Sequence, residues 1–276
     1  MRNTWAVCKR ELKSYFTTPV GFVILGAFAA LSGLYFAMNF LVYAESTVHL
    51  AGRTDQEIPD LEEYFLSPYL VLCGQLIMFI GPLITMRLLA EERNRGTMEL
   101  LLTYPLSDRQ IVLGKYFAGL CMLLMMIATL ISHMGIVAAF SDVEWGVLAF
   151  GLLTVFLMGA AFLSMGLFVS AMANNQITAG AVTFGLWLIL WVLGRLGRQM
   201  PDSIGIPDEW PEGAARAGMF FYDLFRAFVR ELPLDAHAQD MAEGVMRVHD
   251  VAYYLLVIGF FLFLTLRALE SRQWRG

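Results

Sequence analysis

The paired glutamates Glu91 and Glu92 are the residues that most directly bring catalysis to mind. Prenyl-protein proteases use a Glu-Glu-x-x-x-Arg motif inside the membrane, but here Gly96 stands where the arginine is required. His133 lies in an apolar stretch, and one histidine supplies too few ligands for a catalytic metal ion. The glutamate pair therefore does not indicate a metal-dependent protease.

Ser164 and His133 are a second candidate pair, in which a histidine could activate a serine nucleophile. Membrane serine proteases carry a Gly-x-Ser-Gly motif, but Phe162 and Met165 occupy the two glycine positions. An intramembrane enzyme is thus the least supported class. The sequence indicates no catalytic, cofactor-binding or metal-binding residues.

The composition shows that a bilayer is the natural solvent for the chain. Of its 276 residues 58% are hydrophobic and 16% are charged, and the mean hydropathy is +0.62. Soluble domains are about 25% charged. The formal charge of -5 and the lack of a basic patch argue against nucleic-acid binding, which needs clustered Lys and Arg.

Six apolar runs have about the length needed to cross the hydrocarbon core. They cover residues 20–43, 67–86, 116–140, 147–172, 177–194 and 251–268. Twelve of the nineteen Lys and Arg residues then lie on the side of the termini. The positive-inside rule therefore predicts a multi-pass protein of the inner (plasma) membrane with cytoplasmic N- and C-termini.

Two segments outside the spans have helical patterns. In residues 1–16, Trp5, Cys8, Leu12 and Tyr15 recur at helical spacing, which predicts an interfacial helix; a basic flank that only sets topology is the alternative. The outer segment 195–250 has an apolar stripe, which predicts an amphipathic helix that rests on the membrane or caps the bundle. The stripe consists of Phe220, Phe221, Leu224, Phe225, Phe228 and Leu232.

The inner loop, residues 87–115, is more ordered than a plain connector. After a dense run of charges, Gly-Thr at 96–97 can start a short helix, which Pro105 must end. Ser107 and Gln110 have the spacing of a capping box for a second helix that runs into the third span. A charged connector is the alternative, but orientation alone needs only Arg and Lys. The loop could therefore transmit force from a cytoplasmic partner to the membrane spans.

The order of residues in this loop is that of a known family. It reads Glu91, Glu92, Arg93, Arg95-Gly96-Thr97, Glu99 to Leu102, Pro105, Ile111-Val112 and Gly114-Lys115. It resembles the inner loop of ABC-2 permeases, the type V ABC exporters. In that family the loop is a coupling helix that docks on an ATPase subunit. The resemblance implies docking by Glu91, Glu92, Arg93, Arg95, Gly96, Thr97, Glu99, Leu101 and Pro105.

Both ends of the chain also resemble one branch of this family, the gliding-motility-associated ABC permeases. The start reads Cys8 to Phe16 followed by Thr18-Pro19, and the end contains Asp250 to Tyr254 and Phe261 to Thr265. We therefore expect an all-α integral membrane protein, one permease domain over residues 1–276 with six transmembrane helices. Substrate export is the expected function, and a mechanical or assembly platform for an envelope machine is the alternative.

The subunit that hydrolyses ATP in such a system must be another chain. A phosphate-binding Gly-x-x-x-x-Gly-Lys-[Ser/Thr] loop is absent, since Arg109 and Tyr116 interrupt it around Gly114-Lys115. ATP and Mg are thus expected on a partner ABC ATPase. Six spans are few for a translocation path, so we expect a homodimer, or a heterodimer with a second permease or a periplasmic-domain subunit. Residues that could line the path, or only pack helices in lipid, are Gln75, Thr129, Ser132, His133 and Ser164.

Overall fold

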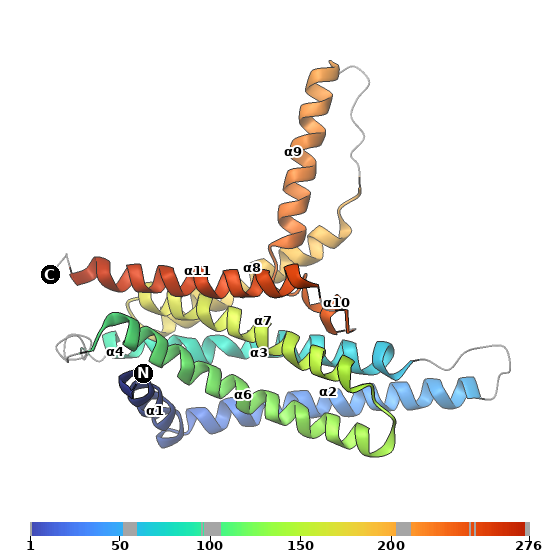
Figure 1. Ribbon diagram of the computed structural model, residues 1–276, viewed down its shortest axis with the longest axis horizontal. Helices are drawn as coiled ribbons and strands as arrows, with labels where there is room; N and C mark the ends of the chain where they lie inside the picture. The colour runs from blue at the N-terminus through green and yellow to red at the C-terminus, as the bar shows by residue number, and fades with distance from the viewer. Residues whose placement is uncertain are drawn as a thin grey trace.

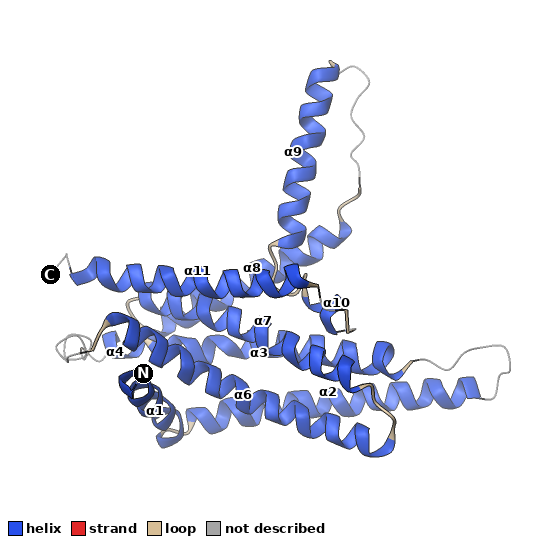
Figure 2. Cartoon of the chain, in the orientation of Figure 1, coloured by secondary structure: helices blue, strands red, loops and turns tan. Residues whose placement is uncertain are grey.

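The computed structural model is a bundle of long helices with one helix projecting from it (Figure 1). It describes residues 2–51, 60–94, 96, 106–202, 211–242, 244–245 and 247–273. Within these ranges the chain contains helices and connecting turns but no strand (Figure 2). The all-α prediction is confirmed.

Six helices in the described ranges are long and apolar enough to cross a membrane, which confirms the predicted number of spans. They are α2 (Val20–Ala51), α3 (Ser67–Leu88) with the preceding π-helical turn η1 (Glu62–Leu66), α6 (Asp108–Phe140), α7 (Trp145–Met172), α8 (Gln176–Gln199) and α11 (Val248–Gln273). Helices α3 and α7 agree with the predicted apolar runs to within two residues at each end, whereas α2, α6, α8 and α11 extend beyond them because polar residues continue the helices. The 32 residues of α2 correspond to about 48 Å, longer than a hydrocarbon core of about 30 Å.

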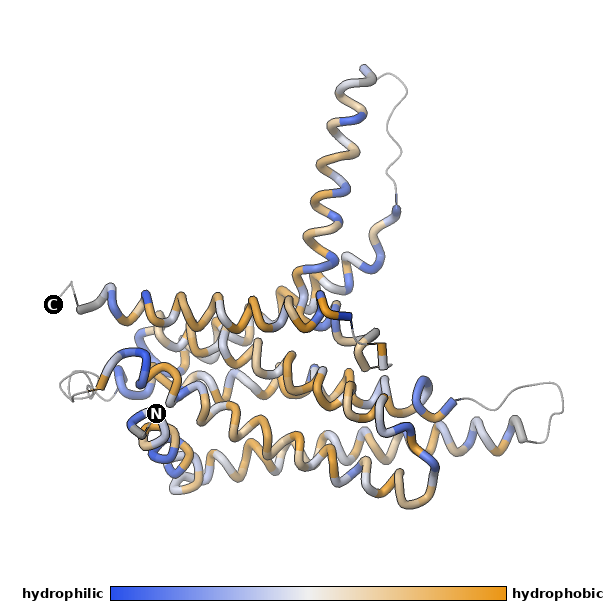
Figure 3. Tube along the Cα trace, viewed as in Figure 1, coloured by the Kyte–Doolittle hydropathy of each residue, from blue (hydrophilic) through white to orange (hydrophobic). Residues whose placement is uncertain are grey.

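The centre of the bundle is formed by α3 and α7. In each of them 61% of the most apolar window is buried, against 22% for α2 and 17% for α8 and α11. Apolar residues nevertheless run along the length of all six helices, including their outward faces (Figure 3). The outer helices therefore present apolar surface to whatever surrounds the bundle, as helices in lipid do.

The two ends of the bundle differ. Both termini, α1 (Arg2–Thr17) and α4 (Ala90–Asn94) lie at one end, here called the terminal end (Figure 1). The opposite end, the distal end, carries η1 and the last turns of α2. The helices α9 (Glu212–Glu231) and α10 (Ala238–Ala242) lie between α8 and α11 in sequence, on the distal side.

Helix α1 covers the residues predicted to form an interfacial helix. Its expected apolar face is divided, however: Cys8 and Tyr15 are buried against the bundle, whereas Trp5 is 65% exposed. Val7, which the helical spacing did not single out, is buried beside Cys8. This helix is therefore anchored to protein and does not only lie along a membrane surface.

Helix α9 runs across the direction of the spans and away from the bundle (Figure 1). Its root is fixed to the end of α8, because the Arg230 guanidinium donates to the Gly197 and Met200 carbonyls at 2.8 and 3.0 Å. Arg226 also contacts Asp202, just after α8. The prediction that this helix caps the bundle is wrong, because the stripe residues on it are more than half exposed: Phe220, Phe221, Leu224, Phe225 and Phe228. A position along the membrane surface fits its direction.

Candidate functional site

The described part of the inner loop starts with the short helix α4, which the sequence did not predict. The chain breaks the α3 geometry at Leu89 and then continues as α4. The backbone N–H groups of Leu89 and Ala90 donate to Ser170 Oγ in α7, at 3.1 and 3.0 Å. Because the first N–H groups of a helix lack intrahelical partners, this serine replaces a cap and ties the loop to α7.

Arg93 ties the loop to α7 a second time. Its guanidinium donates to the carbonyls of Ala171 at 2.8 Å and Met172 at 3.4 Å, and also contacts the Ala173 carbonyl. These carbonyls belong to the last turn of α7, where the helix dipole favours a positive charge. Arg93 therefore neutralises and caps the C-terminal end of the central helix.

Glu91 points toward α3 and α1. Its carboxylate receives a hydrogen bond from Arg87 Nε at 2.8 Å, one helical turn earlier. Arg87 also donates to Thr18 Oγ1 at 3.1 Å and lies 5.5 Å from the centre of the Tyr15 ring. The Tyr15 hydroxyl in turn donates to the Ile84 carbonyl at 2.7 Å. Helices α1 and α3 are thus joined at the point where the loop begins.

Glu92 lies in a cluster of four charged residues. Its Oε1 is 2.7 Å from Arg10 Nη2 and 3.1 Å from Lys115 Nζ, and Glu11 Oε1 makes the same two contacts at the same distances. Lys115 is completely buried. Two carboxylates, from α1 and α4, thus balance two cations, from α1 and α6. A buried charge is tolerated when it is paired in this way.

The surrounding charges change the acidity of Glu11. Burial raises the pKa of this carboxyl, but Lys115 and Arg10 together outweigh burial, so that the pKa lies below its ordinary value. For Arg10 burial lowers the pKa, but Glu11 and Glu92 outweigh it and the pKa is raised. Glu11 and Arg10 therefore hold opposite charges at neutral pH.

Gly114 allows α1 to approach α6 closely enough for the cluster to form. A Cβ atom at this position would lie 2.6 Å from Val7 Cβ and 2.9 Å from the Thr4 carbonyl oxygen, which is closer than atoms can pack. The adjacent Lys115 then meets Glu11 on the facing helix. The Gly-Lys pair of the loop motif therefore has a structural role in this chain.

These contacts together form a unit that we call the terminal clamp. It connects α1, α3, α4, α6 and α7 at the terminal end. Its residues are Arg10, Glu11, Arg87, Glu91, Glu92, Arg93, Lys115 and Ser170. The sequence did not predict the clamp as a unit. Two signals were present: Glu11 lies in the basic first segment, and Lys115 lies at the start of an apolar span.

The rest of the predicted docking loop is described only in part. Gly96 has a φ of +66°, and its N–H donates to the Arg93 carbonyl at 3.0 Å, so it ends α4. The helix predicted to follow it, up to Pro105, lies outside the described ranges. Ser107 forms the predicted capping box with Gln110, whose Oε1 accepts from the Ser107 N–H at 3.2 Å. The other predicted docking residues lie outside the described ranges: Arg95, Thr97, Glu99, Leu101 and Pro105.

The predicted path-lining residues do not form one surface. Gln75 lines a cavity of about 380 Å³ between α2 and the distal half of α3, with Tyr35 and Glu63 on its wall. His133 Nδ1 lies 2.6 Å from the Tyr69 hydroxyl, and Tyr69 stacks on Tyr35. Tyr35 therefore lines the cavity together with Gln75 and, through Tyr69, lies near His133.

The hydroxyl groups in the same prediction bond to their own helices. Thr129 donates to the Met125 carbonyl, Ser132 to Thr129 and Ser164 to Ala161. Ser164 is completely buried. Because His133 is bonded to Tyr69, the described contacts do not join it to Ser164.

Comparison with known proteins identifies the family. Residues 5–197 match the family described as ABC-2 family transporter protein. The chain is 34% identical over 130 residues to the probable ABC transporter permease protein NosY of Pseudomonas aeruginosa, and 34% identical over 126 residues to the protein of the same name in Stutzerimonas stutzeri. These alignments cover 43% and 42% of this chain, and in each case 46% of the relative, so the chain spans about half of each relative's length. The chain belongs to the ABC-2 family of transporter membrane proteins.

Proposed function

We propose that the chain is the permease subunit of an ABC transporter, which exports a substrate across the inner membrane with energy from ATP hydrolysis on a separate subunit. The observation that carries the proposal is the terminal clamp. It connects the start of the inner loop to four helices, α1, α3, α6 and α7, through capping bonds and ion pairs. A force applied to this loop would therefore move the bundle rather than only bend a connector.

The energy source belongs to the partner. ATP and Mg bind the ATPase, and this chain holds no cofactor for the export reaction. Closure of the ATPase on nucleotide would shift the permease between inward-open and outward-open states through differential contacts at the loop. In this scheme the terminal end, with both termini, faces the cytoplasm, in keeping with its excess of Lys and Arg.

A second permease chain completes the path. The outer faces of α2, α8 and α11 are apolar and little buried, which leaves surface for a homodimer or for a heterodimer with a second permease or periplasmic-domain subunit. Lipid covers the remainder. The cavity beside Gln75 is lined by Tyr35 of α2 and by η1 and the distal half of α3, so we assign the path to this part of the chain. Transport rather than catalysis is also what the names of the relatives favour.

A mechanical or assembly platform is the second candidate function. It rests on the projecting helix α9, whose apolar side chains are exposed at the distal side, and on the resemblance of both chain ends to gliding-motility permeases. A platform would use the same ATPase and the same clamp but move no solute. Stimulation of ATP hydrolysis by a solute favours export, whereas stimulation only by a periplasmic protein favours the platform.

The test is co-purification with the ATPase encoded beside this chain, followed by ATPase assays in lipid nanodiscs. Paired substitutions Arg95→Ala and Glu99→Ala are expected to abolish binding of the ATPase. Glu92→Gln, in the clamp, is expected to retain binding but uncouple ATP hydrolysis from the permease. Arg109→Ala, an exposed cation in the first turn of α6 that the resemblance does not place among the docking residues, is the control. Binding that survives the paired substitutions together with Gly96→Pro contradicts the docking assignment.

A further inference from the structure

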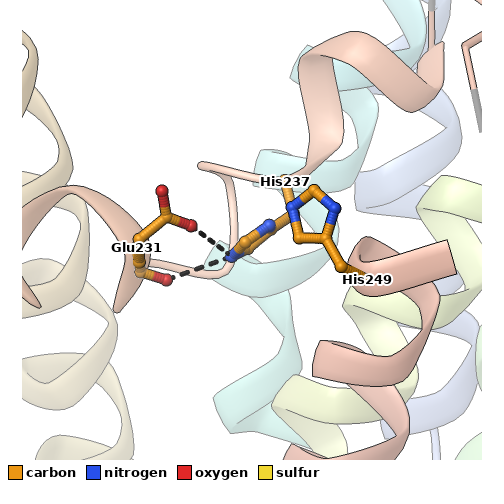
Figure 4. Close-up of side chains that lie close together, drawn as sticks. All are labelled: Glu231, His237 and His249. Carbon is orange, nitrogen blue, oxygen red and sulfur yellow. Dashed lines mark hydrogen bonds and ion pairs between the residues drawn. The ribbon is translucent and has the colours of Figure 1, made fainter. Parts of the chain in front are cut away.

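Three segments bring titratable side chains together at the root of α9. Glu231 is the last residue of α9, His237 lies in the turn before α10, and His249 and Asp250 are in the first turn of α11. Figure 4 shows Glu231 and His249 on either side of His237. His237 and Asp250 are buried, at 6% and 3% exposure, whereas Glu231 and His249 are exposed. A fixed pair is therefore flanked by two side chains that can move.

Both ring nitrogens of His237 face oxygen atoms. Nδ1 lies 2.7 Å from Asp250 Oδ1, and Nε2 lies 3.1 Å from the Glu231 carbonyl oxygen and 3.4 Å from its Oε2. A neutral imidazole donates from only one nitrogen, so the second would direct a lone pair at oxygens. The repulsion between this lone pair and the oxygens is removed if the ring is doubly protonated or if a cation lies at Nε2.

The contact with Asp250 is the one that a metal-binding histidine needs. A ligating histidine almost always donates its other N–H to a carboxylate or carbonyl, which fixes the tautomer and the ring. Here Asp250 accepts from His237 Nδ1 and leaves Nε2 for an ion. The distance of 3.4 Å between Nε2 and Glu231 Oε2 is close to the edge of a zinc tetrahedron, about 3.3 Å for bonds of about 2.0–2.1 Å.

His249 supplies a third ligand. One ligand atom each from Glu231, His237 and His249 can be chosen so that all lie within 4.8 Å of one another. The His237 and His249 rings have centroids 5.7 Å apart. Because Glu231 and His249 are exposed, small rotations of their side chains close the remaining distance.

A second observation points to a missing cation. Asp250 Oδ2 is buried and has no hydrogen-bond partner among the described residues, while Oδ1 contacts both His237 and His249. Glu231 adds another carboxylate to the cluster. An ion of charge +2 would balance this negative charge, and buried charges are costly when they are not balanced.

We propose that Glu231, His237 and His249 bind a divalent transition-metal ion of the Zn²⁺ class, with Asp250 positioning His237. Two imidazoles and a carboxylate are ligands that suit such an ion better than Mg²⁺, which prefers oxygen ligands and keeps its waters. The bound ion would join the end of α9 to the start of the last span. It would thereby hold the projecting helix at a fixed angle to the bundle. The proposal does not depend on the permease assignment.

The test uses the full chain, purified in detergent through a tag without histidines and stripped with EDTA. Addition of Zn²⁺ is expected to load about one ion per chain, measured by mass spectrometry of the metal, and to raise the Tm, whereas Mg²⁺ has no effect. His249→Ala and Glu231→Gln change exposed side chains, so the Tm in EDTA should equal that of the wild type while the Zn²⁺-induced shift is lost. Asp250→Asn should weaken Zn²⁺ binding by about 10–100-fold.

The matched control is His49→Ala. His49 is an exposed histidine 3.7 Å from a carboxylate oxygen of Glu45, but no second histidine accompanies it in the described structure. This variant should keep the full response to Zn²⁺. The proposal is overturned if the stripped wild type takes up no Zn²⁺, or if the double variant Glu231→Gln, His249→Ala retains the wild-type Tm shift.

Discussion

The terminal clamp and helix α9 use polar and apolar residues in opposite ways. In the clamp, charged side chains from α1, α4 and α6 are turned inward and paired, and Lys115 is completely buried. On α9, apolar side chains are turned outward, and its second half is tied to the end of α8 and the residues after it through Tyr222, Arg226 and Arg230. The comparison indicates that the terminal end is built for internal rigidity, whereas the distal side is built to meet lipid or another protein.

Loss of the buried lysine should have the largest effect on stability. Lys115→Met leaves the carboxylates of Glu11 and Glu92 with only Arg10 between them. Because removal of one partner leaves buried charge uncompensated, the free energy of unfolding should fall by about 3 kcal/mol, measured by SDS titration in mixed micelles. Lys13→Met, at an exposed position of α1, is the control. If both variants lose the same stability, the clamp does not hold this end together.

A smaller loss should follow from a side chain at Gly114. In Gly114→Val the new atoms would overlap Val7 and the Thr4 carbonyl, so that α1 must move away from α6. Overpacking of this kind costs about 2 kcal/mol. Gly135→Val is the matched control on the same helix, because a Cβ at Gly135 meets no atom within 4 Å. Equal thermal stability of the two variants would show that the close approach of α1 is not required.

The clamp should also respond to acid. The pKa of Glu11 lies below its ordinary value of 4.5, so its contribution to stability is present above pH 4.5 and is lost as the pH falls through the lower, folded-state value. The wild-type Tm should therefore fall more steeply below pH 4.5 than that of Glu11→Gln, in which this contribution is already absent. Glu45→Gln, at an exposed site on α2, should follow the wild-type curve. Parallel curves for all three proteins would contradict the role given to Glu11.

The smallest effect on stability is expected on α9. Phe221→Trp and Asp223→Trp place a fluorophore on and off the apolar stripe, and both should leave the free energy of unfolding within about 0.5 kcal/mol of the wild type. In vesicles with brominated lipids, the tryptophan at 221 should be quenched and the tryptophan at 223 should not. Equal quenching would contradict an orientation with the stripe toward lipid.

The spans could be predicted because their signal is local. A run of about 20 apolar residues is sufficient to identify a crossing helix, and all six were found. The capping box at Ser107 and Gln110 was predictable for the same reason, since both residues lie within four positions. The helix ends were less accurate because hydropathy marks the membrane, whereas a helix continues until a cap or turn stops it.

The clamp could not be predicted because it depends on contacts between distant parts of the chain. Glu92 meets Arg10 across 82 positions, and nothing near Glu92 in sequence indicates this partner. The charge pattern of the loop was interpreted as a docking surface, but in the structure Glu91, Glu92 and Arg93 contact the chain's own helices. Docking by the rest of the loop stays a prediction. The two histidines of the proposed metal site were missed because the spacing between His237 and His249 is not that of a common metal-binding motif.

The projection of α9 would give the molecule a larger cross-sectional area in the distal leaflet of a bilayer than in the other leaflet. A helix of 20 residues is about 30 Å long and about 10 Å wide, so α9 lying flat would occupy about 300 Å² of one leaflet. Helix α1, at the other end, is packed closely against α6. The protein would then act as a wedge that favours a bilayer curved toward the distal side.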